Sequence, residues 1–148
     1  MTHETSNAEF NKLEIDKIFE VIVSVDIQLK KYFDEYLFEE YKNDFTSRLD
    51  YCDMAEISRF IVDRVRSKQD YFLKDLFVKV EQILLSCDTT VEELIVVGLF
   101  EGIQNIGGSE IDYYSGFDKW LLPTSKLKWD RLIDTWEGSD WRNKKIKG

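Results

Sequence analysis

Apolar residues recur at three- and four-residue intervals along most of the chain, which is the spacing of helices that bury one face. Leu13, Ile18 and Ile22 form such a stripe near the start, and Leu76, Val80 and Leu84 form another. The pattern predicts a short helix from Asp118 to Leu121 and longer helices over Ala8 to Val25, Ile27 to Phe45, Asp53 to Arg66, Lys68 to Ser86, Thr89 to Ile106 and Pro123 to Gly138.

The distribution of helix breakers supports this reading. The first glycine is Gly98 and the only proline is Pro123, so the first hundred residues contain few turn signals. Asp53 with Glu56 has capping-box spacing, and Thr89 and Thr90 open two overlapping boxes. We therefore expect an all-α, single-domain bundle of five or six helices over residues 1–148, with 1–7 and 139–148 as loose tails.

The string "KYFDEYLFEEY" at residues 31–41 holds five aromatic and four acidic residues. At helical spacing, one face of this segment enters the core. A second stripe suits protein recognition, because tyrosines give contact area and carboxylates pair with basic groups. In the alternative reading, the tyrosines pack against neighbouring helices and the acids are solvated. The core face holds Leu29, Phe33, Leu37 and Tyr41, and the second stripe holds Tyr32, Glu35, Tyr36 and Glu39.

The segment "LIVVGLFEGIQNIGG" has no polar face in its first half, so we expect it to be buried all round. Gly98 and Gly102 lie four residues apart, where another helix, or a second copy of the chain, can approach closely. Glu101 lies near Gln104 and Asn105 on the next turn. These polar residues favour either a structural carboxylate or, as an alternative, a ligand pocket with Glu101 as acid or base.

Two candidate features lie nearer the C-terminus. Trp129 and Trp136, seven residues apart on an apolar stripe, are expected to be core anchors. The turn-rich stretch before them contains Asp112, Tyr113 and Tyr114, which we predict as partner-contact residues because loops on a rigid scaffold often carry recognition.

Composition narrows the class of partner. The net charge of −9 disfavours nucleic acid and anionic membrane and favours a basic protein. Cys52, Cys87 and His3 lack the spacing of a disulfide framework or a metal site, and no catalytic motif or cofactor signature is present. The missing motifs predict a protein without catalytic residues, metal or cofactor. Reduced thiols and a polar N-terminus predict a cytoplasmic location.

Two resemblances add to this picture. "VGLFEGIQN" and "LLPTSKLKWDRLIDTW" resemble a family of small, uncharacterised bacterial helical proteins. The size, acidity and lack of catalytic motifs are similar in type to immunity proteins, which block a cognate bacterial toxin in contact-dependent growth inhibition. The positions that carry the first resemblance are Gly98, Glu101, Gln104, Asn105, Leu121, Pro123, Ser125, Trp129, Leu132 and Trp136.

The leading hypothesis is therefore an acidic, non-catalytic protein that blocks a basic partner, such as the nuclease domain of a toxin. Its expected contacts are the second stripe of residues 27–45 together with Asp112, Tyr113 and Tyr114. The alternatives are an enzyme or small-ligand protein built around Glu101, and a helical regulatory or adaptor subunit, including a homodimer through Gly98 and Gly102. The sequence leaves the oligomeric state open.

Overall fold

The computed structural model describes residues 14–42 and 44–142, and this part of the chain is built from helices and contains no strand. The predicted all-α, single-domain fold is confirmed. Residues 14–23 are helical. They are followed by α2 (Ile27–Tyr41), η1 (Phe45–Ser47), α3 (Asp50–Arg66), α4 (Leu73–Ser86), α5 (Thr89–Glu93), η2 (Leu94–Phe100), α6 (Glu101–Gly107), η3 (Gly108–Glu110) and α7 (Pro123–Glu137).

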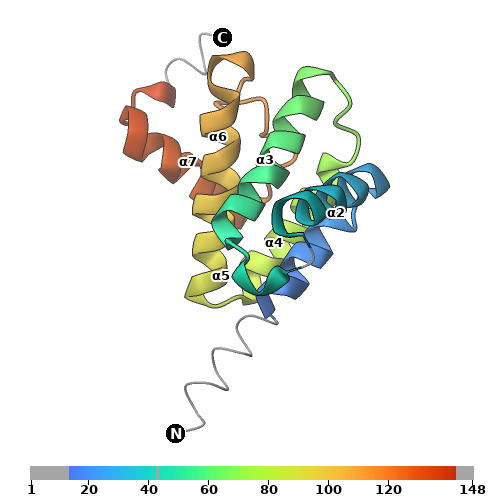
Figure 1. Cartoon of the computed structure of the whole chain (residues 1–148). Helices are drawn as coiled ribbons and strands as arrows, with labels where there is room; N and C mark the ends of the chain where they lie inside the picture. The colour runs from blue at the N-terminus through green and yellow to red at the C-terminus, as the bar shows by residue number, and fades with distance from the viewer. Residues whose placement is uncertain (1–13, 43, 143–148) are drawn as a thin grey trace, which may run out of the picture.

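The centre of the molecule is a pair of long helical elements. One is α3, and the other is the continuous rod of α5, η2 and α6 beside it (Figure 1). Helix α2 covers α3 on one side of the body, and α7 lies on the other side of the rod. The buried core between these elements includes Met54, Ile57, Ile61, Leu73, Leu76, Phe77, Ile95, Leu99, Phe100 and Trp129.

Gly98 and Gly102 allow α3 and the rod to approach closely. A methyl group on Gly98 would lie 3.1 Å from Cβ of Met54, and one on Gly102 would lie 2.6 Å from Oγ of Ser58. The buried Ser58 hydroxyl donates to the Leu99 carbonyl at 2.9 Å. The two glycines thus serve a contact within the chain, which corrects the expectation of a homodimer through this face.

The middle of the rod, η2, is a π-helix, a wide form of helix that is rare and occurs mostly as short segments. Val96 and Val97 lie on the side of this segment that faces away from α3. Val97 is 46% exposed and Val96 is half-buried, so the expectation that this segment is buried all round is wrong at these two positions.

Helix α7 begins at Pro123 and ends before Gly138, as predicted. The residue before it, Leu122, offers no capping side chain. The buried carboxylate of Glu81, on α4, replaces that cap. It accepts hydrogen bonds from the backbone N–H groups of Thr124 at 2.9 Å and Ser125 at 2.8 Å, and from the Ser125 hydroxyl at 2.8 Å.

Several predicted boundaries are wrong for local reasons. Helix α2 ends at Tyr41, where Lys42 turns into the left-handed region. Helix α4 starts only at Leu73, and residues 118–120 form turns rather than the start of a helix. The cap of α5 is Asp88, whose carboxylate accepts from the Val91 N–H at 2.9 Å, so neither threonine box is used.

The C-terminal end of the described chain also differs from the prediction. Trp136 is 63% exposed instead of buried, and Trp141 is the second buried tryptophan, with 1% exposure. Its indole N–H donates to Asp134 at 2.6 Å, and its ring stacks on Tyr114 at 5.9 Å. The predicted tail therefore does not begin at residue 139. Residues 1–7 and 143–148 lie outside the described residues.

Candidate functional site

The predicted stripe on α2 divides into tyrosines that bond to α3, with Tyr36 half-buried and Tyr32 36% exposed, and outward carboxylates. The Tyr36 hydroxyl donates to Asp53 at 2.8 Å, and the Tyr32 hydroxyl donates to Glu56 at 2.8 Å. Burial together with the bond to Glu56 raises the pKa of Tyr32 to about 12. Glu35 and Glu39 are exposed and have no hydrogen bond or ion pair to the described residues. Only the carboxylates of the stripe are thus fully available to a partner.

Asp53 anchors α2 and η1 to α3. Its fully buried carboxylate accepts from the hydroxyls of Tyr36 and Tyr41 and from Nε of Arg48 at 2.8 Å. The Arg48 guanidinium also lies 5.0 Å from the ring centre of Phe19. Burial first, and then the bond to Asp53, raise the pKa of Tyr36 far above its usual value. Asp53 is therefore a tertiary anchor within α3, not the helix cap that its spacing with Glu56 suggested.

The outward side of α2 carries an exposed ring among carboxylates. Phe38 is 54% exposed, and Asp34, Glu35 and Glu39 lie four, three and one residues from it on the same side of the helix. We call these four residues the α2 acidic face. Lys30 pairs with Asp34 at 3.2 Å, so Glu35 and Glu39 are the carboxylates of this face that have no ion pair within the described residues.

A hollow of about 320 Å³ adjoins the α2 acidic face between α2 and α3. The rings of Tyr32 and Phe60, 5.2 Å apart between centres, form part of its wall, and Glu35 stands at its edge. The Arg64 guanidinium lies 4.5 Å from the Phe60 ring centre. The remaining lining residues are Gln28 and Lys31. An aliphatic stem from a partner can therefore pack on aromatic surface while its polar end reaches Glu35.

The predicted contact residues of the loop are held by α7 instead. The hydroxyls of Tyr113 and Tyr114 both donate to Glu137, and the Tyr113 carbonyl accepts from the Trp129 indole at 2.9 Å. Burial and the bond to Glu137 raise the pKa of Tyr113. Asp112 is exposed, and its carboxylate accepts from two backbone N–H groups that follow it in the turn.

The loop residues and the α2 stripe do not form one surface. The tyrosines of the loop are tied to the end of α7, whereas Tyr32 and Tyr36 are tied to α3, and α2 and α7 lie on different sides of the body (Figure 1). The structure thus separates the seven predicted contact residues into two groups.

The polar residues around Glu101 do not converge on a pocket. The Gln104 side chain is buried and donates to the Trp129 carbonyl at 3.3 Å, whereas Asn105 is exposed and Glu101 is half-buried. Gln104 thus joins the rod to α7. Within the described residues, no group of three or more histidine, cysteine, aspartate or glutamate side chains is arranged to hold a metal ion.

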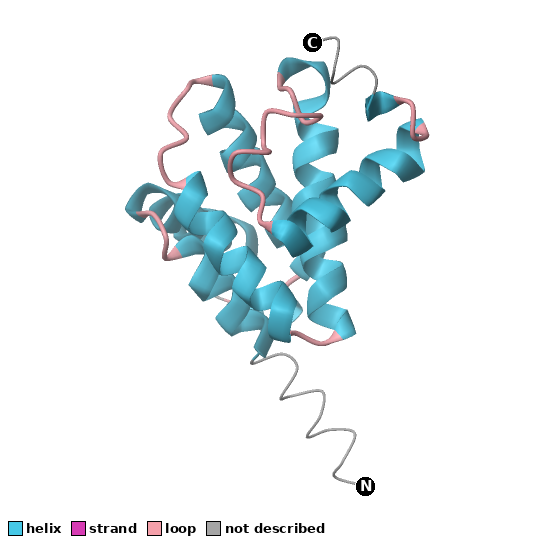
Figure 2. Ribbon diagram, turned by 180° about the vertical axis from the view of Figure 1, so that it is seen from behind, coloured by secondary structure: helices cyan, strands magenta, loops and turns pink. Residues whose placement is uncertain are grey.

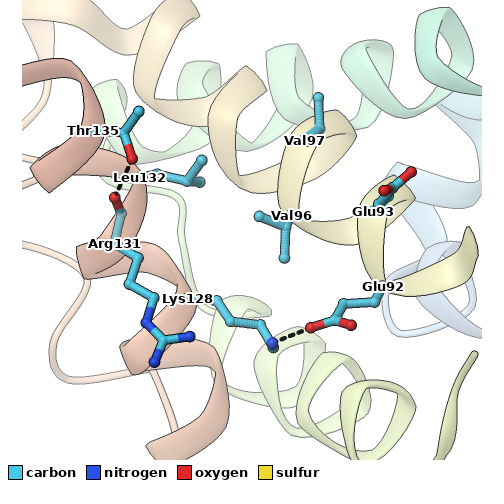
Figure 3. A pocket seen from close by; sticks show the side chains of 8 residues that line it. All are labelled: Glu92, Glu93, Val96, Val97, Lys128, Arg131, Leu132 and Thr135. Carbon is cyan, nitrogen blue, oxygen red and sulfur yellow. Dashed lines mark hydrogen bonds and ion pairs between the residues drawn. The ribbon is translucent and has the colours of Figure 1, made fainter. Parts of the chain in front are cut away.

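A second hollow, of about 250 Å³, was not foreseen from the sequence (Figure 3). It lies between the rod and α7, and its floor is formed by the side chains of Val96, Val97 and Leu132. Glu92 and Glu93 stand on one rim, and Lys128 and Arg131 stand on the other. Lys128 pairs with Glu92 across the hollow. No signal for this site was present in the sequence, because the apolar run predicted burial on every side of the segment that forms its floor.

Residues 19–137 match the family described as a domain of unknown function (DUF7674), and the chain belongs to this family. No curated protein and no solved structure matches the chain significantly. No helix of the described chain has the length and apolar character needed to cross a lipid bilayer.

Proposed function

We propose that this member of the DUF7674 family is a non-catalytic binding protein whose α2 acidic face covers a basic surface of a protein partner. The observation that carries the proposal is the pair of exposed carboxylates, Glu35 and Glu39, beside the exposed ring of Phe38 on one helix. Carboxylates of this kind pair with lysine and arginine, and an aromatic ring that becomes buried supplies most of the binding energy.

The charge of the whole chain supports the same partner. A net charge of −9 accelerates the encounter with a basic protein, since complementary fields steer the two molecules together. The interface ring then governs how slowly the complex dissociates. The hollow beside the α2 acidic face adds a place for the stem of an arginine or lysine, with Glu35 at its edge.

Tyr36 and Tyr41 contribute by fixing α2 rather than by touching the partner. Tyr36 and Tyr41 both donate to buried Asp53, so α2 is attached to α3 before any partner arrives. A surface that is already ordered loses less conformational entropy when it binds, and this raises affinity without an additional contact.

The nuclease domain of a bacterial toxin is the partner whose chemistry fits best. Its active-site cleft must be basic, because it attracts the phosphates of nucleic acid. An acidic helix with a central aromatic residue can occupy that cleft and exclude the substrate. On this proposal the chain acts in the cytoplasm as an immunity protein, a class that inhibits its toxin by covering it.

Binding of the purified partner to two charge-reversal variants tests the proposal. The partner is captured from the host of the chain with the tagged protein, purified, and titrated by calorimetry at low and at moderate salt. Glu35→Lys/Glu39→Lys is compared with Asp75→Lys/Asp140→Lys, a pair of exposed acids on other elements. Both variants change the net charge from −9 to −5, because each exchange adds two charges.

We expect the α2 variant to weaken binding at low salt by at least tenfold, and the control to weaken it far less. Equal affinities of the two variants would assign the effect to total charge and remove α2 from the interface. A captured partner with an acidic surface would overturn the proposed partner class. Circular dichroism of both variants shows whether the helices remain intact.

A further inference from the structure

The exposed side chain of Trp136 lies on the same face of the molecule as the hollow between the rod and α7. Trp136 follows Leu132 by four residues, so both side chains lie on one side of α7, about one helical turn apart. Leu132 is part of the floor of the hollow between the rod and α7, and Trp136 is 63% exposed. Large exposed aromatic residues beside an apolar depression are typical of protein interfaces.

The size of the hollow suits one large side chain. Its volume of about 250 Å³ equals roughly eight water molecules at liquid density. Val97, 46% exposed, widens the apolar floor toward the surface. Water over such a floor has few polar partners, so an aromatic ring that displaces it gains hydrophobic free energy.

The charges around the hollow match those of a second copy of the same face. Two acids, Glu92 and Glu93, stand opposite two bases, Lys128 and Arg131, so the rim is neutral although the chain carries −9. Lys128 pairs with Glu92, whereas the side chains of Glu93 and Arg131 make no hydrogen bond or ion pair within the described part of the chain. A partner of one charge sign would repel half of this rim, but a copy turned by a two-fold axis presents the opposite sign at each position.

We propose that two copies of the chain associate through this face, with Trp136 of each copy inserted into the hollow of the other. We call the surface formed by Glu93, Val97, Arg131, Leu132 and Trp136 the α7 face. Because a two-fold contact is self-complementary, Glu93 of one copy meets Arg131 of the other, and the same pair forms twice.

This dimer is independent of the proposed function. Helix α2 lies on the other side of the body from α7, so both α2 acidic faces stay exposed in the dimer (Figure 1). Loss of association through the α7 face would leave partner binding at α2 unchanged, and failure of binding at α2 would leave the dimer in place.

Sedimentation velocity of the full chain, from low micromolar to several hundred micromolar, tests the proposal. We expect a concentration-dependent monomer–dimer equilibrium. Trp136→Ala should raise the dissociation constant by at least about 30-fold, the effect of removing one interface hot spot, and two such contacts are lost in each dimer. Phe38→Ala, which removes another exposed ring from α2, is the matched control and should leave the equilibrium unchanged.

Charge exchange gives a second test that does not depend on truncation. Glu93→Arg and Arg131→Glu should each weaken the dimer at low salt, because each places like charges opposite one another. The double variant Glu93→Arg/Arg131→Glu should restore association to within about threefold of the parent, since the pairs are re-formed with exchanged signs.

A chain that sediments as a monomer at every concentration would overturn the proposal and leave the hollow to a different occupant. A dimer that survives Trp136→Ala unchanged, or a double charge variant that fails to recover, would likewise exclude this face as the contact. Circular dichroism confirms that each variant has the helix content of the parent before its mass is interpreted.

Discussion

The tertiary cap on α7 makes a quantitative prediction for Glu81→Gln. The Glu81 carboxylate lies at the N-terminus of α7 and accepts three hydrogen bonds from Thr124 and Ser125. A carboxamide retains one acceptor oxygen, and its NH₂ group replaces the other, facing a donor. The substitution therefore removes at least one hydrogen bond to a charged acceptor, worth about 1.5–3 kcal/mol. It also removes a negative charge at a helix N-terminus, worth roughly 0.3–1 kcal/mol.

We expect Glu81→Gln to lower the free energy of unfolding by about 2–3 kcal/mol at neutral pH, since the two effects overlap in part. Urea unfolding followed by circular dichroism and tryptophan fluorescence measures this difference. Glu40→Gln, which neutralises an exposed glutamate on α2, is the control and should change stability by no more than about 0.5 kcal/mol.

The pH dependence of the same difference tests its electrostatic origin. Burial opposes ionisation of Glu81, but the hydrogen bonds from Thr124 and Ser125 outweigh it and lower the pKa of the carboxyl group. A lowered pKa in the folded state means that the stabilisation is complete above the pKa of the unfolded chain, about 4.3. It is lost as the pH falls through the lower folded value. The gap between parent and Glu81→Gln should therefore be largest at neutral pH and shrink in acid.

A gap below about 0.5 kcal/mol at neutral pH would refute the assigned cap, because even one hydrogen bond to a charged acceptor is worth about 1.5–3 kcal/mol. A gap of the expected size that stays constant between pH 7 and acid would refute the charge as its cause. In that case the loss would come from packing of the amide group.

Three further substitutions follow from the contacts that join the elements. Gly102→Ala should destabilise the fold, because the new methyl group would lie 2.6 Å from the Ser58 hydroxyl. Urea unfolding of Gly102→Ala, Ser58→Ala and the double variant checks this contact, and the double variant should lose less free energy of unfolding than the two single variants lose in sum. Tyr36→Phe should lower the free energy of unfolding by about 1 kcal/mol, since the buried Asp53 loses one of its donors, and the same titration measures it. Gly116→Ala should strongly destabilise the fold, because its methyl group would lie 2.4 Å from the Asp112 carbonyl oxygen, a backbone atom that no side-chain rotation can move. Thermal unfolding measures the effect, and a melting temperature equal to that of the parent would contradict the contact.

The sequence predicted elements wherever one residue fixes the backbone by itself. Pro123 sets the start of α7 and Gly138, with φ of 74°, sets its end, and both boundaries were foreseen. The fold class followed from the apolar spacing for the same reason, because burial of one stripe is a property of each segment alone. These inferences needed no knowledge of what each segment packs against.

The errors arise where a side chain is used by a distant element. Asp53 has the spacing of a helix cap, yet α2 and η1 supply the donors for its carboxylate, so α3 begins three residues earlier. Leu122 has no capping side chain, and the cap comes from Glu81 on another helix. Trp136 continues the apolar stripe of α7, but it is 63% exposed, whereas Ile133, about one turn earlier, is fully buried.

The candidate surfaces show the same limit. The sequence identified the aromatic and acidic residues of α2 but not which way each would turn, since the acceptors Asp53 and Glu56 of its two tyrosines lie on α3. The hollow beside α7 was missed because the apolar run that forms its floor predicted burial on every side, whereas Val97 is 46% exposed.

The two proposed surfaces together specify how the chain would act on its partner. A dimer through the α7 face presents two α2 acidic faces that point away from each other, so one free partner domain cannot occupy both. Affinity for the free domain is then set by one α2 face and should be the same for the parent and for Trp136→Ala. On a surface that carries many partner domains the dimer can engage two at once, and effective concentration slows its release. Trp136→Ala should therefore shorten the residence time on a dense partner surface while the affinity in solution stays unchanged, and a loss in both would place Trp136 at the partner rather than at a second copy.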